Sequence, residues 1–132
     1  MKPLKLALTK GRLEKNTVEL LNSKGYDVNE LINKGRKLIL DIPNGNFEVV
    51  LAKSADVITY VEHGVCDMGI VGKDTIMENG TELYEVMDLG FGKCRFALIA
   101  KKDCDFYSGY NKKIIATKYP IVAKNFFDKK GM

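Results

Sequence analysis

The stretch Leu4–Gly25, LKLALTKGRLEKNTVELLNSKG, decides the fold class of this 132-residue chain. Leucines at every second position (Leu4, Leu6 and Leu8) are typical of a half-buried strand. After a short turn, apolar residues recur at helical spacing until Gly25, where a helix is expected to stop. A strand, a glycine turn and a helix in this order open an α/β unit.

The rest of the chain continues the alternation of strands and helices. A Pro-Asn-Gly turn between two β-rich runs predicts a hairpin, because Asn and Gly adopt positive φ at low cost. A final helix at Pro120–Lys130 is expected to bury Phe126 and Phe127. This order predicts an α/β fold with a largely parallel sheet. The further predicted strands are residues 37–42, 47–52, 67–72, 84–89, 94–100 and 114–117, and a helix is predicted at 55–63.

Basic side chains gather at the two ends of the chain, and carboxylates gather in its middle. Residues 1–40 carry nine Lys/Arg and four Asp/Glu, residues 41–100 carry four and ten, and residues 101–132 carry eight and three. The acidic middle would repel a nucleic-acid backbone, and basic residues are not interleaved with aromatic ones as in single-strand binders. The distribution therefore favours a small polyanionic ligand between basic loops, and no nucleic-acid partner is expected.

The composition, 45% hydrophobic and 29% charged, is typical of a folded soluble protein. The sequence has no uncharged run of about 18 residues and no secretory signal, so we expect a cytoplasmic location and no membrane partner. The three cysteines form no C-x-x-C pair, and no protein-bound metal is expected. The single histidine, His63, follows a predicted helix, where a structural role at the helix end is favoured.

The turn Lys10–Gly11–Arg12 is the first candidate site. It lies between the first strand and the first helix, where open α/β sheets bind ligands. Free N–H groups at a helix start favour phosphate, and arginine can bind two phosphate oxygens at once. Arg36, in a basic loop before the hairpin, and Lys53, before the next helix, are further candidates. A solvated surface role is the alternative for all of them.

The stretch Asp67–Asp74, DMGIVGKD, is the most distinctive in the chain. Gly69 and Gly72 leave room for a ligand to approach the backbone, although they could instead ease packing. Asp74 is expected to cap the next helix. Further along, the stretch Asp88–Gly92, DLGFG, suits a loop over a ligand, with a plain turn as the alternative.

Together, these motifs resemble the catalytic chain of the ATP phosphoribosyltransferase family. Six stretches occur in the family's order, and this order is more specific than any single stretch. The family often has arginine where Lys53 stands. The matching stretches are Leu6–Leu13 (LALTKGRL), Gly35–Leu40 (GRKLIL), Lys53–Gly64 (KSADVITYVEHG), Cys66–Asp74 (CDMGIVGKD), Asp88–Arg95 (DLGFGKCR) and Ala116–Pro120 (ATKYP).

The resemblance implies a two-lobed fold like that of the type II periplasmic binding proteins, with the active site in the cleft. Residues 1–101 would form the first lobe, and residues 102–132 a linker and the first βα unit of an incomplete second lobe. The family's second lobe carries a loop that holds the 5-phosphate of phosphoribosyl pyrophosphate, and this loop has no counterpart here. We therefore expect a C-terminally truncated chain that is inactive by itself.

The reaction that the resemblance implies is the first step of histidine biosynthesis. Phosphoribosyl is transferred from phosphoribosyl pyrophosphate to N1 of ATP, which gives phosphoribosyl-ATP and pyrophosphate. Mg²⁺ and fixed arginines would stabilise the leaving pyrophosphate. The implied catalytic residues are Arg12 and Arg36, supported by Lys10 and Lys53. The implied substrate-binding residues are Gly11, Asp67, Gly69, Gly72, Lys73, Asp88, Gly90, Phe91 and Gly92.

The resemblance also implies partners beyond the two substrates. These are further copies of the chain and, in the short form of the family, a regulatory subunit related to histidyl-tRNA synthetase. The main rival interpretation is a non-catalytic module that binds a small anion or solute, because the same two-lobed architecture serves solute receptors.

Overall fold

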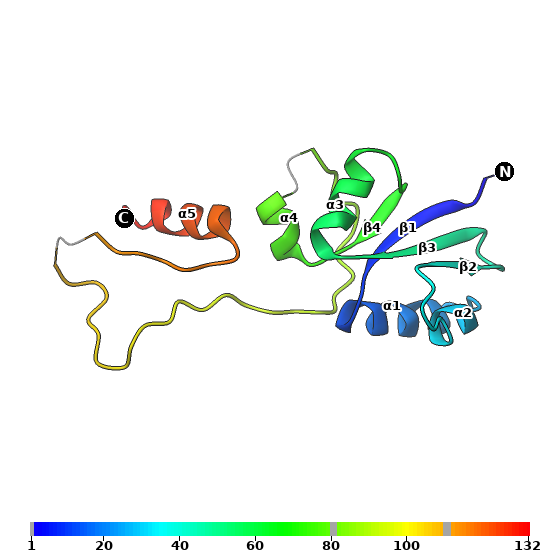
Figure 1. Cartoon of the computed structure of the whole chain (residues 1–132), viewed down its shortest axis with the longest axis horizontal. Helices are drawn as coiled ribbons and strands as arrows, with labels where there is room; N and C mark the ends of the chain where they lie inside the picture. Colours follow the sequence, from blue (N-terminus) through cyan, green and yellow to red (C-terminus); the bar gives the residue numbers. More distant parts are fainter. Residues whose placement is uncertain (1, 80–81, 110–111) are drawn as a thin grey trace.

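The computed structural model describes residues 2–79, 82–109 and 112–132, and its centre is a four-stranded sheet (Figure 1). The strand order is β2-β3-β1-β4, in which β1 runs parallel to β3 and β4 while β2 is antiparallel to β3. The predicted α/β class with a largely parallel sheet is therefore confirmed. The elements are β1 Leu4–Thr9, α1 Arg12–Ser23, α2 Asn29–Ile32, β2 Ile39–Ile42, β3 Phe47–Ala52, α3 Ser54–Glu62, β4 Met68–Ile70, α4 Lys73–Asn79 and α5 Pro120–Lys129.

Helices cover both faces of the sheet. In β1 the side chains alternate, so that Leu6 and Leu8 join the apolar cluster on the side of α1 and α2, whereas Ala7 joins the cluster under α3. Figure 1 shows α1 and α2 on one side of the sheet and α3 on the other. A sheet covered on both faces explains the short uninterrupted apolar runs at Leu6–Leu8 in β1 and Val49–Ala52 in β3.

The hairpin between β2 and β3 forms where the Pro-Asn-Gly turn predicts it. Asn46, the last residue of this turn, has a φ of 53°, in the left-handed region that asparagine tolerates. Asn44 fixes the turn to the loop after α1, because its amide accepts the N–H of Asp27 at 2.7 Å and donates to the carbonyl oxygen of Gly25 at 2.8 Å. The turn of the hairpin is thereby hydrogen-bonded to the segment that follows α1.

Three predicted strands, at residues 84–89, 94–100 and 114–117, are wrong. These segments are extended, but none pairs with a strand in the part of the chain that the structure describes. A strand needs a neighbouring strand that binds its N–H and C=O groups. High β propensity in these segments was therefore not sufficient for strand formation. Their apolar side chains face solvent: Val86 is 81% exposed, Ile99 86% and Ile114 92%.

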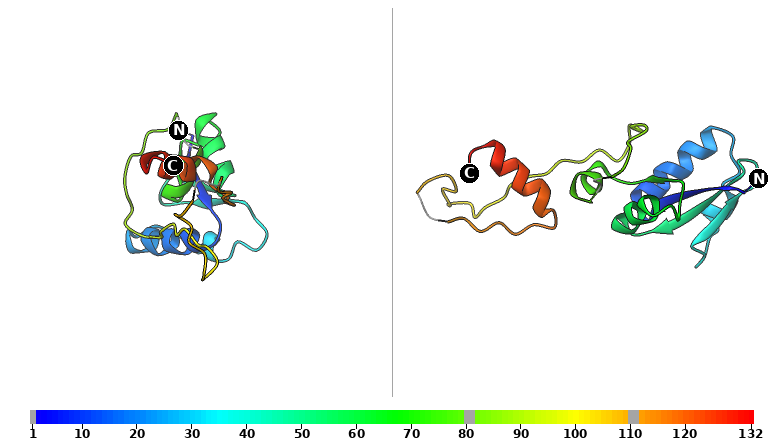
Figure 2. Two further views of the ribbon diagram at one scale, coloured as in Figure 1. Left: turned by 90° about the vertical axis from the view of Figure 1, so that its left-hand side faces the viewer. Right: turned by 90° about the horizontal axis from the view of Figure 1, so that it is seen from above.

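The last helix forms close to its predicted bounds but does not bury its aromatic residues. Phe126 is 45% exposed and Phe127 is half-buried, and none of the residues of α5 is fully buried. The reason is its position, because α5 packs beside α4 instead of lying on the sheet. Figures 1 and 2 both show α5 beyond α4 along the long axis of the molecule. None of the described helices is long and apolar enough to cross a membrane.

Candidate functional site

The topology brings four segments with predicted site residues to one edge of the sheet. β1 and β3 are parallel, so the turn after Thr9 and the residue after Ala52 lie at the same edge. β2 is antiparallel to β3, and Leu51 donates its N–H to the carbonyl oxygen of Leu38, so the loop before β2 reaches this edge too. Gly72 and Lys73 follow β4, the third parallel strand. We call this set the basic edge: Lys10, Arg12, Arg36, Lys53 and Lys73.

Gly11 and Glu14 shape the turn that starts α1. Gly11 has a φ of 101° and a ψ of −129°, a conformation that side chains rarely allow. Its N–H donates to the Glu14 carboxylate at 3.2 Å. Glu14 also forms an ion pair with Lys34, which holds the loop that carries Arg36 against the first turn of α1. Sequence reasoning missed Glu14 and Lys34, although glutamate three residues after an N-cap is the capping-box spacing.

The turn at Asp88–Gly92 lies against the same end of α1. The Arg12 guanidinium donates to the carbonyl oxygen of Lys93 at 3.3 Å. A Cβ added to Gly92 would lie 2.6 Å from Cδ2 of Leu13, so the backbone approaches α1 closely at this point. The structure therefore places the turn at Asp88–Gly92 next to Arg12, at the start of α1.

Within this turn, the Asp88 side chain binds the backbone of the turn itself. Its carboxylate accepts the N–H of Gly90 at 2.8 Å, and both Gly90 and Gly92 have positive φ. Phe91, between the two glycines, is half-buried. The geometry is that of an Asx turn, which was the alternative interpretation of this stretch.

The remaining basic residues lie exposed at the edge. Arg36 and Lys53 make no side-chain hydrogen bond or ion pair to any residue in the described ranges. Lys73 is engaged, because its ammonium pairs with the carboxylate of Glu85. The hydroxyl of Thr9, at the end of β1, is buried and finds no hydrogen-bond partner among the described residues. Such an unpaired polar group is rare and calls for a partner.

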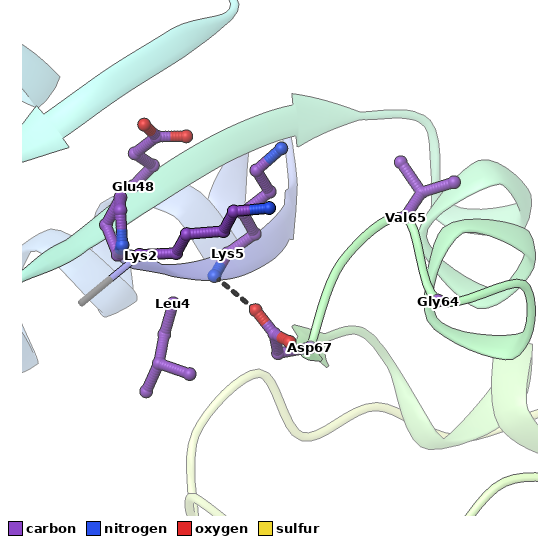
Figure 3. A pocket seen from close by; sticks show the side chains of 8 residues that line it. Lys2, Leu4, Lys5, Glu48, Gly64, Val65 and Asp67 are labelled. Atoms are coloured by element: carbon purple, nitrogen blue, oxygen red, sulfur yellow. Dashed lines mark hydrogen bonds between the residues drawn. The ribbon is translucent and has the colours of Figure 1, made fainter.

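Asp67 is not brought together with the basic edge. It precedes β4 at the opposite edge of the sheet, where its carboxylate accepts the N–H of Lys5 at 2.8 Å and its own N–H donates back to the Lys5 carbonyl oxygen at 2.9 Å. Asp67, Lys2 and Lys5 line an open pocket of about 340 Å³ at this edge (Figure 3). Glu48 lines the same pocket, so positive and negative charges are mixed there.

The surroundings of the two glycines of the distinctive stretch differ. A Cβ at Gly69 would lie 2.8 Å from Val57 Cγ1 and 3.1 Å from Val61 Cγ2, so its absence lets α3 pack directly on β4. A Cβ at Gly72 would overlap the carboxylate of Asp74. Asp74 was predicted to cap α4, but α4 begins at Lys73 and Asp74 lies in its first turn. Close packing, the alternative interpretation of these glycines, accounts for Gly69, whereas at Gly72 the overlap is only with the end of a flexible side chain.

The cysteines and the histidine lie outside the basic edge. Burial raises the pKa of the Cys66 thiol above its ordinary value, so the thiol is kept protonated in the core under α3. His63 takes the structural role expected of it, because it ends α3 and its Nδ1 lies 3.0 Å from the carbonyl oxygen of Thr59. Within residues 2–79, 82–109 and 112–132, no group of three or more His, Cys, Asp or Glu side chains could hold a metal ion.

Fold and site together define an α/β protein whose sheet presents a cationic edge at the carboxyl ends of its parallel strands, the end at which open α/β sheets bind ligands. The sequence profile of the ATP phosphoribosyltransferase family matches residues 53–132. The chain belongs to this family.

Individual relatives agree with the family match over nearly the whole chain. An ATP phosphoribosyltransferase of Clostridium kluyveri is 59% identical over 128 residues, which is 97% of this chain and 58% of the relative. One from Clostridium novyi is 54% identical over 134 residues, covering 100% of this chain and 63% of the relative. The chain thus spans about three fifths of the length of these relatives.

A solved structure has the same fold. It is described as the ATP phosphoribosyl transferase (HisG:HisZ) complex from Thermotoga maritima, and it matches with a TM-score of 0.64 at 26% sequence identity. The match covers 97% of this chain and 59% of that chain.

Proposed function

We propose that this chain carries the nucleotide-binding part of an ATP phosphoribosyltransferase, which transfers phosphoribosyl from phosphoribosyl pyrophosphate to N1 of ATP. The observation that supports the proposal most is the basic edge. Arg12 and Arg36 lie on neighbouring turns at the carboxyl ends of the strands, and the Glu14–Lys34 ion pair joins these turns. Membership of the family supplies the reaction, and the edge supplies charge for its anionic substrates.

The chemistry matches what such an edge can do. The adenine N1 attacks C1 of the ribose and forms a C–N bond, while the bond from C1 to the pyrophosphate oxygen breaks and pyrophosphate leaves with the electron pair. The adenine N1 is largely unprotonated near neutral pH, so no strong general base is needed. The energetic difficulty is the negative charge on the leaving group, which fixed cationic side chains stabilise.

We assign roles by position at the basic edge. Arg12 and Arg36 would bind phosphate oxygens, with Lys10 and Lys53 supporting them, and the free N–H groups at the start of α1 would add to the field. Gly11 keeps the turn close to the ligand, and the unpaired Thr9 hydroxyl is a further donor at the end of β1. The turn at Asp88–Gly92, held by Arg12, would line the site from the side.

The two-lobed architecture belongs to the proposal as well. Residues 1–101 would form the first lobe, with residues 102–132 beginning the second, and the active site would lie in the cleft between them. The support is the match to a structure of which this chain covers 59%.

Magnesium enters the proposal only with the substrates. The side chains gathered at the basic edge are cationic, and no cluster of three metal-ligating side chains occurs among the described residues. The described residues therefore offer no metal cage of three or more protein ligands. Mg²⁺ is usually bound by one or two carboxylates together with substrate phosphates, and we propose that it enters here with the phosphates of the substrates.

We further propose a cytoplasmic enzyme that assembles with other chains. The matched Thermotoga maritima structure is a complex of two kinds of chain, which supports a separate partner, in the family's terms a regulatory subunit related to histidyl-tRNA synthetase. A homo-oligomer of this chain is the second proposed assembly.

Calorimetric titration of the 132-residue chain with ATP, and in parallel with free amino acids, tests the proposal against the rival solute-binding module. The proposal predicts heat of binding with ATP that is lost at high salt, because the phosphates are held by exposed charges. Binding of an amino acid without binding of ATP would contradict it and favour the rival.

A further inference from the structure

Two carboxylates on α4 bind the start of α5. Asp74 and Glu78 are four residues apart, so they lie on the same face of α4. Glu78 accepts the N–H of Ile121 at 3.1 Å on one carboxylate oxygen and the N–H of Val122 at 2.9 Å on the other. The Tyr119 hydroxyl donates a hydrogen bond to the Asp74 carboxylate, with 2.8 Å between the oxygens. These three hydrogen bonds join residues 43 to 45 positions apart in the chain.

Glu78 completes the hydrogen bonding of the first turn of α5. Pro120, the first residue of this helix, has no N–H, and the N–H of Ala123 already donates to the carbonyl oxygen of Tyr119 within the helix. The two remaining N–H groups of the first turn are those that Glu78 accepts. No side chain of α5's own N-cap residue binds there. A carboxylate at this position also interacts favourably with the helix dipole.

Tyr119 is the second point of attachment. Its ring packs edge-to-face against Phe96, with 5.0 Å between the ring centroids, so the chain leaving the sheet and the chain returning to α5 meet at this residue. The hydrogen bond to Asp74 raises the pKa of the Tyr119 hydroxyl. Gly72 leaves room for this position of the Asp74 carboxylate, which a Cβ would overlap.

We infer that Asp74 and Glu78 form a carboxylate latch that fixes the position of α5 relative to the sheet. α5 has no fully buried residue, so apolar burial alone does not hold it in place. α4 directly follows β4 at the basic edge, so the latch connects this edge to α5. If the active-site cleft of the proposed function lies between the sheet and α5, the latch determines how wide this cleft is. That consequence rests on the proposed function, whereas the latch itself does not.

Amide hydrogen exchange of the full 132-residue chain, followed by NMR, tests the latch without any assay of activity. The variant Glu78→Gln keeps the size of the side chain but replaces one acceptor oxygen with an NH₂ group and removes the charge. We expect exchange at Ile121 and Val122 to become at least tenfold faster, with β1 and β3 amides changed less than twofold. The control is Glu62→Gln, an exposed glutamate at the end of α3 with no side-chain hydrogen bond to the described residues.

Unchanged exchange at Ile121 and Val122 in Glu78→Gln would overturn the inference. So would an equal acceleration of the β1 and β3 amides, because Glu78 would then act on the stability of the whole fold and not on α5. Tyr119→Phe tests the second attachment by itself, since it removes only the hydroxyl that binds Asp74 and keeps the ring against Phe96.

A distance measurement tests the position of α5 directly. Spin labels are attached through Lys15→Cys on α1 and Asn125→Cys on α5, both exposed, after the exposed Cys94 and Cys104 are replaced by serine. We expect a distance distribution at least twice as wide when Glu78→Gln and Tyr119→Phe are combined. A distribution of unchanged width and mean in the combined variant would contradict the latch.

Discussion

The guanidinium of Arg12 donates a hydrogen bond to the carbonyl oxygen of Lys93, 3.3 Å away, although the two residues are 81 positions apart in the chain. This contact attaches the turn at Asp88–Gly92 to the start of α1. It also orients one of the two arginines assigned to phosphate binding. The basic edge is therefore held in place from two sides, by Lys93 at Arg12 and by Lys34 at Glu14.

Removing either arginine is expected to weaken ATP binding. Arg12→Ala and Arg36→Ala each delete a charged donor at an exposed edge, so we expect a loss of about 1.5 kcal/mol, or roughly tenfold in Kd. Calorimetric titration of the 132-residue chain measures this loss. Lys24→Ala, which removes a positive charge at the far end of α1, is the control and is expected to leave Kd within about twofold. Equal effects at Lys24 and Arg12 would refute the assignment.

Gly69 is expected to matter for stability and not for binding. In Gly69→Ala the new methyl group would press on Val57 and Val61, which we expect to destabilise the fold by about 1–3 kcal/mol. Urea unfolding measures the effect, and a double-mutant cycle with Val57→Ala should show favourable coupling, because the smaller side chain makes room. If Gly69→Ala weakens ATP binding at unchanged stability, Gly69 contacts the ligand instead.

Asn44 is expected to stabilise the fold through its two hydrogen bonds to the loop after α1. Asn44→Ala removes both, which we expect to lower the free energy of unfolding by about 1–3 kcal/mol. Asn22→Ala, an exposed position on α1 whose side chain makes no hydrogen bond to a described residue, is the matched control. A loss no larger than that of the control would show that the hairpin does not depend on Asn44.

The buried thiol of Cys66 is expected to make stability depend on alkaline pH. Its pKa in the folded chain is raised above the ordinary value of 9.0, so the unfolded chain loses the proton first as pH rises. The contribution is fully present below about pH 9 and is lost as pH rises through the folded-state pKa. Denaturant unfolding between about pH 8 and 10 measures the slope, and Cys66→Ala should flatten it. An unchanged slope would assign the dependence to other groups, such as Tyr119.

Much of the sheet could be predicted from sequence because its signals are local. The alternating leucines of β1, the apolar run of β3 and the turn at Pro43–Asn46 each depend on a few neighbouring residues. The helix α2 was missed because a single turn is too short for a periodic pattern. The strands predicted after residue 82 are absent from the described structure because each needs a pairing partner, which a local sequence pattern does not reveal.

For the candidate site, the sequence indicated which charged residues to consider but not all of their contacts. The positions of Lys10, Arg12, Arg36 and Lys53 at one edge follow from the parallel pairing of β1 and β3 and the antiparallel hairpin. Asp67 was grouped with them because the family resemblance covers Cys66–Asp74. It lies at the opposite edge because a strand crosses the sheet between the two. The contact between Arg12 and Lys93 carries no signal in the sequence.

An NMR titration of the 132-residue chain with ATP tests the central claim most directly, because it reports binding residue by residue. We expect amide shift changes at Gly11, Arg12, Arg36 and Lys53, with little change at Lys5 and Asp67. Shifts concentrated at the pocket of Lys2, Lys5 and Asp67, or no shifts at millimolar ATP, would contradict it.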